Sequence, residues 1–199
     1  ARRAVDRGAD VVVLPCNTAS VTALEHVRAD LGESVPVVGT VPAIKPAAAV
    51  CDSVAIWATA ATTASRYQAN LIEQFANGSE VVGVACHGLA DAIDAGVQVA
   101  AAEAIASAAA RTPEDVEGVV LGCTHYPLVA DTIAAHLPSG VRLFDSAEAV
   151  ARQTLRRIDA LGRTSPGSGH VEVYVSGTRG ELPAAAAAFE DGRLLLAAA

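Results

Sequence analysis

Two apolar, β-branched runs in this chain each end in a cysteine that is followed by small polar residues and a helical pattern. They occupy residues 11–20 and 119–127. A buried strand that leads directly into a helix is the unit of a parallel α/β sheet, and ligands bind where the strand gives way to the helix. A helix N-terminus offers free N–H groups and a positive dipole end, which lower a thiol pKa and attract a carboxylate. Two matched thiols therefore indicate a reaction that needs an acid on one side of a carbon and a base on the other.

The rest of the chain alternates strand and helix patterns in the same way, which predicts parallel sheets covered by helices. We expect two similar, pseudo-symmetric α/β units whose mostly parallel sheets face each other across a cleft. The first unit comprises residues 1–41 and 145–199, the second comprises 42–144, and a Gly/Ser-rich connector occupies 162–169. Strands are predicted at 10–14, 35–38, 53–57, 80–84, 117–121, 141–144 and 171–175, and helices at 18–31, 42–50, 64–76, 97–110, 127–136, 147–160 and 182–189.

Composition limits the classes of partner. The chain has 199 residues, of which 52% are hydrophobic and only 4% aromatic, so Ala, Val and Leu must build the core. A formal net charge of −8 argues against nucleic acid or an anionic membrane surface as the main partner. No apolar run approaches the roughly 18 residues of a membrane helix, and residues 1–6 do not resemble a signal peptide. We therefore expect a cytoplasmic protein that binds a small molecule, with a homodimer left open.

The four cysteines show no C-x-x-C spacing, and in a cytoplasmic protein we expect them to be reduced. Cys51 and Cys86 are expected to be small buried residues, whereas the other two stand at strand–helix junctions. A metal site is an alternative that lacks local ligand spacing. Its ligands would be Cys16, Cys86, His87, Cys123 and His125.

At residues 15–20 and 121–128 the chain resembles the two signature motifs of cofactor-independent glutamate racemase. Residues 35–43 and 145–147 are similar to other parts of that family. The resemblance implies that Cys16 and Cys123 are the catalytic pair. One thiolate removes the α-proton of glutamate while the other thiol protonates the opposite face, with His125 assisting Cys123. It also implies that no pyridoxal phosphate or metal is used and that D-glutamate is supplied for peptidoglycan synthesis.

The resemblance also implies substrate contacts beside each thiol and in a separate loop. The loop at 58–63 is similar to the family's Gly-Thr-x-x-Thr segment, with Ala58 in place of the glycine. An aspartate occupies the position where the family usually has a glutamate. The implied substrate-binding residues are Asn17, Thr18, Thr59, Thr62, Asp94 and Thr124.

Two early family motifs do not occur in these 199 residues: the Asp-Ser-Gly-x-Gly-Gly loop and a loop with a Tyr-Gly pair. The opening also reads as the end of a helix, with Gly8 as its C-terminal cap. We therefore expect that an N-terminal segment is missing and that the chain alone has weak or absent activity. Two alternatives stay open: an aspartate or hydantoin racemase of the same superfamily, and a non-catalytic relative that binds acidic amino acids.

Overall fold

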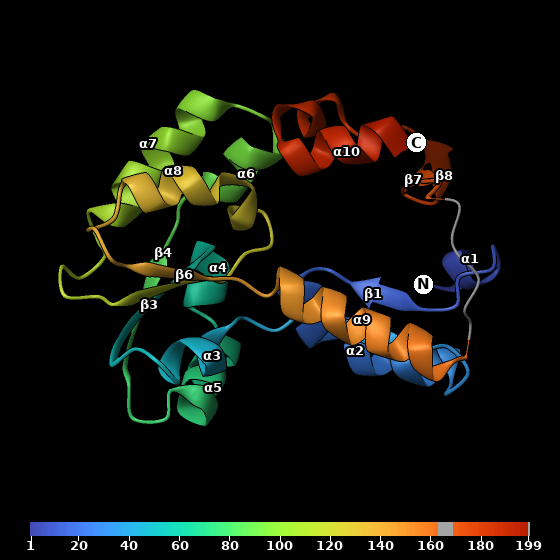
Figure 1. The fold of residues 1–199 in the computed structure, drawn as a ribbon, viewed down its shortest axis with the longest axis horizontal. Helices are drawn as coiled ribbons and strands as arrows, with labels where there is room; N and C mark the ends of the chain where they lie inside the picture. Colours follow the sequence, from blue (N-terminus) through green and yellow to red (C-terminus); the bar gives the residue numbers. More distant parts are fainter. Residues whose placement is uncertain (163–168, 199) are drawn as a thin grey trace.

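A parallel four-stranded sheet, in the order β4–β3–β5–β6, forms the centre of one half of the molecule (Figure 1). The computed structural model describes residues 1–162 and 169–198. The two central strands are almost wholly buried, as expected for continuous apolar runs in a parallel sheet. The strands are β3 (Ser53–Ala58), β4 (Glu80–Ala85), β5 (Gly118–Leu121) and β6 (Arg142–Phe144).

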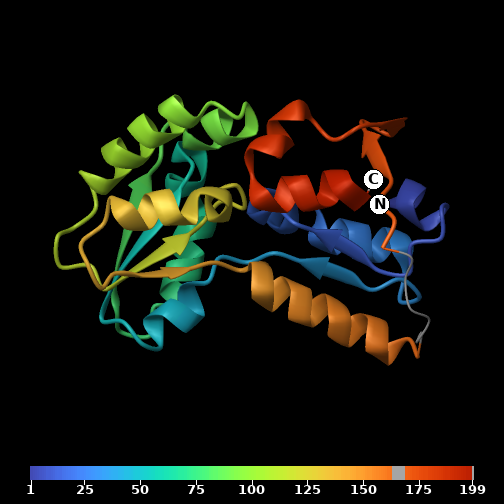
Figure 2. The same ribbon diagram turned by 45° about the horizontal axis from the view of Figure 1, so that its top comes forward.

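Alternate residues of β3 point into two separate cores, one on each face of the sheet. Ala55 and Trp57 pack into the first core, whereas Val54 and Ile56 pack into the second. Helices close both faces (Figures 1 and 2). The first core is covered by α6 (Leu89–Asp94), α7 (Gln98–Ala109), the 3-10 helix η1 (Tyr126–Val129) and α8 (Ala130–Ala135). The second is covered by α3 (Ile44–Ala48) and α5 (Arg66–Phe75), and α4 (Ala60–Thr63) contacts β3 and β4.

The other half holds a smaller parallel sheet of two strands, β1 and β2. Two longer helices, α2 and α9, contact β2. This sheet is less completely buried than the central strands β3 and β5 of the larger one, because two of the three residues of β1 are only half-buried. The elements of this half are α1 (Arg2–Val5), β1 (Val12–Leu14), α2 (Asn17–Leu31), β2 (Val37–Gly39) and α9 (Ala147–Ala160).

The C-terminal residues form an antiparallel hairpin and two further helices. The hairpin joins β7 (Val173–Val175) to β8 (Thr178–Gly180) through Ser176 and Gly177, whose φ angles of 49° and 83° suit the two-residue turn that matches strand twist. The 3-10 helix η2 (Ala184–Ala188) and α10 (Glu190–Ala198) follow. In both ribbon views α10 extends from the hairpin toward α6 and so links the two halves (Figures 1 and 2).

The predicted fold class, α/β with mostly parallel sheets, is confirmed, but several elements differ. The helix predicted at 64–76 is α5, which begins at Arg66 because the Ser65 side chain accepts a hydrogen bond from the Gln68 N–H as its N-cap. Helix α4 precedes it and was not predicted. Helix α6, strand β8 and helix α10 were not predicted, and 184–188 is a 3-10 helix. The connector predicted at 162–169 lies almost entirely outside the described residues.

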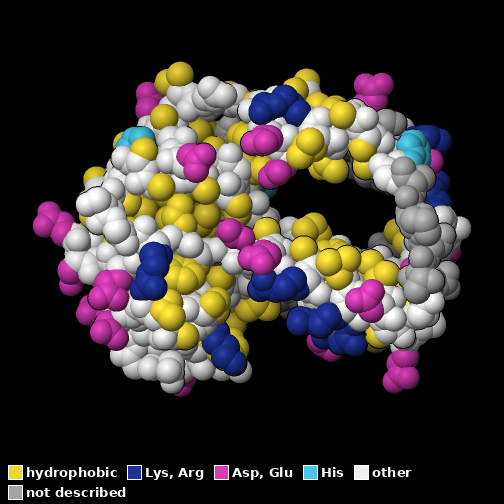
Figure 3. All heavy atoms as spheres, in the orientation of Figure 1, with side chains coloured by type: hydrophobic (Ala, Val, Ile, Leu, Met, Phe, Trp, Pro, Cys, Tyr) yellow, Lys and Arg dark blue, Asp and Glu magenta, His cyan; other side chains and the backbone are white. Residues whose placement is uncertain are grey.

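The surface carries scattered charges of both signs and several exposed apolar side chains (Figure 3). Leu194 and Leu195 of α10 and Leu155 of α9 are among the exposed apolar residues. The space-filling view shows an opening between α10 and the half that holds β1 and α9 (Figure 3). In the described part of the chain, no helix is both long and apolar enough to cross a membrane.

Candidate functional site

A buried hydrogen bond joins the two cysteine segments. The Asn17 side-chain amide donates from Nδ2 to the Gly122 carbonyl oxygen at 2.8 Å. Asn17 directly follows Cys16, and Gly122 directly precedes Cys123. The two cysteines are also close enough to interact electrostatically, because a charge on Cys16 raises the pKa of Cys123. The fold thus brings two thiols from opposite halves of the molecule to one place.

Cys16 is the N-cap residue of the 15-residue helix α2 and is half-buried. Backbone N–H groups at this end of a helix have no acceptor within the helix. Two buried hydroxyl residues, Ser20 and Thr40, hold the segment in place. The Thr40 N–H donates to Ser20 Oγ at 2.7 Å, and Thr40 Oγ1 donates to the Leu14 carbonyl oxygen at 2.8 Å.

Sequence reasoning missed Ser20 and Thr40 as positioning residues. A usable signal for Ser20 was its spacing, because a residue three positions after Asn17 lies on the same helix face. Asn17 and Ser20 are the buried residues of α2. Thr40 gave no comparable local signal, since its role depends on the pairing of β1 with β2.

Cys123 follows the buried strand β5 through a glycine that touches the neighbouring strand. The Gly122 N–H donates to the Trp57 carbonyl oxygen at 2.8 Å, and a Cβ on Gly122 would lie 2.9 Å from that oxygen. Cys123 is half-buried and packs against the first core. Only a glycine allows the strand end to approach this closely.

Burial raises the pKa of the Cys123 thiol, the charge of Cys16 raises it further, and a hydrogen bond from the His125 backbone opposes the shift. The expectation that a helix N-terminus lowers this pKa is therefore wrong for Cys123. The helical segment that follows is only the four-residue 3-10 helix η1, and desolvation is the largest cause of the shift.

An imidazole and a carboxylate extend from Cys123 in a chain. Cys123 Sγ lies 3.7 Å from His125 Nδ1, and His125 Nε2 lies 3.6 Å from Asp94 Oδ1. The carboxylate forms an ion pair with the ring only when the histidine is protonated. Both side chains are accessible to solvent, so they can exchange protons with a substrate or with water.

The threonines predicted to bind substrate differ from one another in burial and in their hydrogen bonds. Thr59 caps α4: its Oγ1 accepts from the Thr62 N–H at 3.3 Å and donates to Thr62 Oγ1 at 3.0 Å. Because β3 and β5 are parallel neighbours, Thr59 leaves the sheet at the same edge as Cys123. Thr124 is half-buried beside Cys123, whereas Thr18 is exposed on the first turn of α2.

A second buried pair, Cys86 and Tyr126, lies behind Cys123. Burial raises the pKa of Cys86 to about 12, and burial also raises the pKa of Tyr126. The Tyr126 hydroxyl interacts with the Cys86 thiol but has no partner at hydrogen-bonding geometry among the described residues. Cys51 and Cys86 are both buried and free, as expected.

The five residues of the alternative metal site do not form a ligand cluster. Across residues 1–162 and 169–198, no group of three or more His, Cys, Asp or Glu side chains is gathered closely enough to hold a metal ion.

Residues 1–154 match the family model of Asp/Glu/hydantoin racemase. Glutamate racemase from Pectobacterium carotovorum is 39% identical over 151 residues, which are 72% of this chain and 52% of the relative. Glutamate racemase from Vibrio campbellii is 38% identical over 173 residues, which are 84% of this chain and 63% of the relative. The chain thus spans about half to two thirds of the length of these relatives.

Solved structures give the same result. Escherichia coli glutamate racemase, determined with L-glutamate and an activator, superimposes with a TM-score of 0.72 at 33% identity, covering 79% of this chain and 62% of that one. Glutamate racemase from Thermus thermophilus gives a TM-score of 0.62 at 30% identity, covering 83% and 62%. Sequence and fold agree, and the chain belongs to the Asp/Glu/hydantoin racemase family.

Proposed function

We propose that this chain carries the two-cysteine acid–base centre by which cofactor-independent glutamate racemases interconvert L- and D-glutamate. The observation that supports this most directly is the Asn17–Gly122 hydrogen bond, which ties the segment of one thiol to the segment of the other. A racemase needs one group on each side of Cα, and two thiols held by opposite halves of a fold meet that need.

The raised pKa of Cys123 suits it to act first as the acid. At neutral pH this thiol is protonated and can deliver a proton to Cα. Cys16 is then the group that removes the α-proton as a thiolate, and the roles reverse for the other enantiomer. The His125 imidazole, 3.7 Å from Cys123 Sγ, is placed to take up the proton from Cys123 when Cys123 acts as the base.

The buried amide of Asn17 has one free polar atom for the substrate. Its Nδ2 is committed to Gly122, whereas its Oδ1 is buried with no partner in the described residues. A buried acceptor without a donor is unfavourable, and the substrate ammonium would satisfy it. Further substrate contacts are proposed at the positions that the family resemblance implies: Thr18, Thr59, Thr62, Asp94 and Thr124.

The choice of glutamate over aspartate or hydantoin rests on the relatives, which are glutamate racemases at 36–40% identity. In this role the product is D-glutamate for peptidoglycan synthesis, and the reaction belongs in the cytoplasm. A homodimer is compatible with the proposal. We also propose that residues 1–41 with 145–199 and residues 42–144 are the two halves of the site, which the separate sheets β1–β2 and β4–β3–β5–β6 support.

The test is turnover of L-glutamate in heavy water by the purified protein. We expect deuterium at Cα of the D-glutamate formed, because the proton that is delivered comes from an exchangeable thiol. Cys51→Ala serves as a control, since Cys51 is a buried cysteine outside the site. A folded protein that binds glutamate without exchange or inversion would make the chain a binding relative instead of a racemase.

A further inference from the structure

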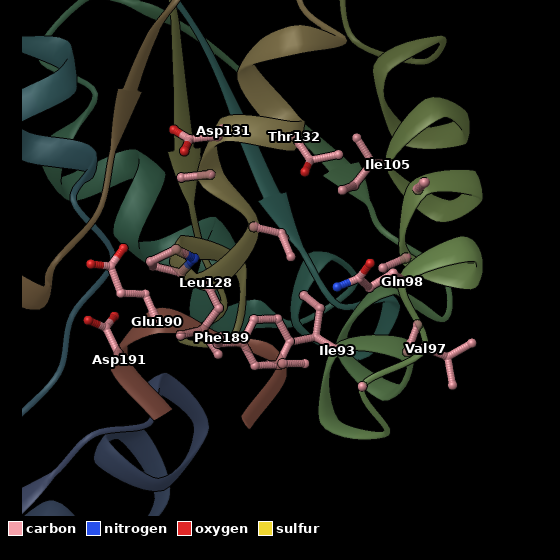
Figure 4. Close-up of a pocket in the computed structure, with 18 residues that line it drawn as sticks. Ile93, Val97, Gln98, Ile105, Leu128, Asp131, Thr132, Phe189, Glu190 and Asp191 are labelled. Atoms are coloured by element: carbon pink, nitrogen blue, oxygen red, sulfur yellow. The ribbon is translucent and has the colours of Figure 1, made fainter. Parts of the chain in front are cut away.

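Residues of α6, α7, η1 and α8 line a groove of about 540 Å³, and residues 188–191 of the C-terminal segment line it as well (Figure 4). We call residues 183–198 the C-terminal strap; it contains η2 and α10. The groove borders the two elements beside the His125–Asp94 pair. Helix α6 ends at Asp94, and η1 begins directly after His125.

Phe189, at the junction of η2 and α10, is the side chain that the strap inserts. It is half-buried and packs against the first core. In the close-up it lies between Leu128 and Ile93, which line the same groove (Figure 4). Ile93 directly precedes Asp94, and Leu128 follows His125 by three residues. Phe189 therefore packs against the core residue that precedes Asp94 and lines the same groove as Leu128, which follows His125.

A second contact lies on the other side of Asp94. Gly96 has a φ of +70°, and a Cβ at this position would lie 3.2 Å from Cβ of Ala185. The strap thus touches the chain one residue before Asp94 and two residues after it. Within the strap, Gly192 packs against the Ala186 carbonyl so closely that any side chain there would collide with it. This tight turn fixes the direction in which Phe189 points.

The strap is also held at its far end, on the half that carries Cys16. The Val171 N–H donates to the Ala198 carbonyl oxygen at 2.9 Å, which ties α10 to the start of the hairpin segment. Arg7 Nε donates to the Tyr174 hydroxyl at 2.8 Å, and its guanidinium stacks 4.4 Å from the centre of the ring. Tyr174 belongs to β7, and Arg7 follows α1. The strap is therefore fixed at both ends, beside α6 at Phe189 and beside the hairpin segment at Ala198.

We infer that the C-terminal strap is a positioning element, in which Phe189 holds α6 against η1 and thereby sets the His125–Asp94 separation beside Cys123. Phe189 is a positioning residue and not a catalytic one, because it acts through Ile93 and Leu128. The importance of this for turnover rests on the proposed racemase function. The effect of the strap on the surroundings of Cys123 does not rest on that function, so the positioning role and the racemase function can be tested separately.

The experiment compares Phe189→Ala with the unaltered protein in two measurements that need no turnover. The first is the alkylation rate of each cysteine by iodoacetamide across pH, read by peptide mass spectrometry. The second is hydrogen exchange. Phe189→Ala should speed exchange in α6 and η1 and change the Cys123 alkylation rate by about 2- to 30-fold, the range for substitutions that couple through packed neighbours. The Cys16 rate should change less than about 2-fold at the lower end of that range.

Leu194→Ala is the matched control, because Leu194 is an exposed apolar residue of the same strap that does not line the groove. It should leave both measurements unchanged, and Phe189→Leu should restore most of the native behaviour because it refills the groove. If Phe189→Ala unfolds, Phe189→Val, which leaves less of the groove empty, is compared with Leu194→Ala and should show the same changes at a smaller size. Unchanged exchange in α6 and η1, or faster exchange without a change at Cys123, would overturn the inference. In a protein that racemises glutamate, Phe189→Ala should also lower kcat more than it alters KM.

Discussion

Cys16 and Cys123 follow similar sequence patterns but occupy different environments. Cys16 follows a three-residue strand of a two-stranded sheet and caps a helix of 15 residues. Cys123 follows a fully buried strand inside a four-stranded sheet, and only a four-residue 3-10 helix begins after it. Burial dominates the second environment and raises the thiol pKa, although the same local pattern predicted the opposite shift.

The difference shows that a strand–Cys–helix pattern fixes where a thiol lies but not how readily it ionises. The size of the sheet and the core packed against it decide how much water reaches the sulfur. For a reaction that uses one thiol as an acid and the other as a base, unequal environments are useful, because burial favours the protonated form of Cys123. The following predictions test this inequality.

The largest effect should come from removing either thiol. Cys16→Ala and Cys123→Ala should each reduce glutamate racemisation by at least about 100-fold, since a general acid or base typically contributes 10²- to 10⁴-fold. Circular dichroism of the product mixture measures the rate. Racemisation that survives in one variant at more than about a hundredth of the native rate would show that the other thiol can work alone.

The glycines beside the two segments should respond unequally to alanine. Gly122→Ala should destabilise the protein by about 1–3 kcal/mol, because its Cβ meets the backbone carbonyl of Trp57, which cannot move aside. Gly39→Ala should be milder, because its closest neighbour is the flexible end of Leu24. Urea unfolding gives both free energies. Equal losses would contradict the view that the β5 end is the more tightly packed of the two.

The tether between the segments should contribute a smaller amount. Asn17→Ala removes the donor to the buried Gly122 carbonyl and should lower the free energy of unfolding by about 1–2 kcal/mol. Thr18→Ala, one residue further along α2 and exposed, is the matched stability control. If the two variants are equally stable, the hydrogen bond does not hold the halves together.

The smallest effect is a pH dependence that originates behind Cys123. The pKa of Cys86 is about 12 in the folded protein, above the ordinary thiol value of about 8.5 that we assign to the unfolded chain. Below the pKa of the unfolded thiol, both states keep the proton and the stability due to Cys86 is complete. Above that pKa the unfolded chain loses the proton first, so the free energy of unfolding falls by up to about 1.4 kcal/mol per pH unit.

Thermal unfolding between roughly pH 7 and 10 measures this slope, because the range brackets the ordinary thiol pKa. Cys86→Ala and Cys86→Val should both flatten it, and the second variant keeps more of the side-chain volume. A slope that persists in both would place the titrating group elsewhere.

The order of the main elements was predictable from local pattern. Apolar β-branched runs gave β3 and β5, and the Ala-rich periodic stretch gave α7, because such signals need only neighbours in sequence. Elements whose formation depends on packing were missed. Helix α6 is only six residues long and is stabilised by Leu89 and Ile93, which are buried in the first core. The hairpin carried a Ser-Gly turn signal that could have been read.

The sequence by itself determined the family, the α/β class and the positions of two cysteines at strand–helix junctions, because these depend on residue patterns that span about ten neighbours. Only the tertiary structure decided the raised pKa of Cys123, the Asn17–Gly122 hydrogen bond and the position of Phe189 between α6 and η1. Each of these joins residues that are distant along the chain. Burial and electrostatics are set by whichever groups surround an atom in space, so they become known only when the chain is folded.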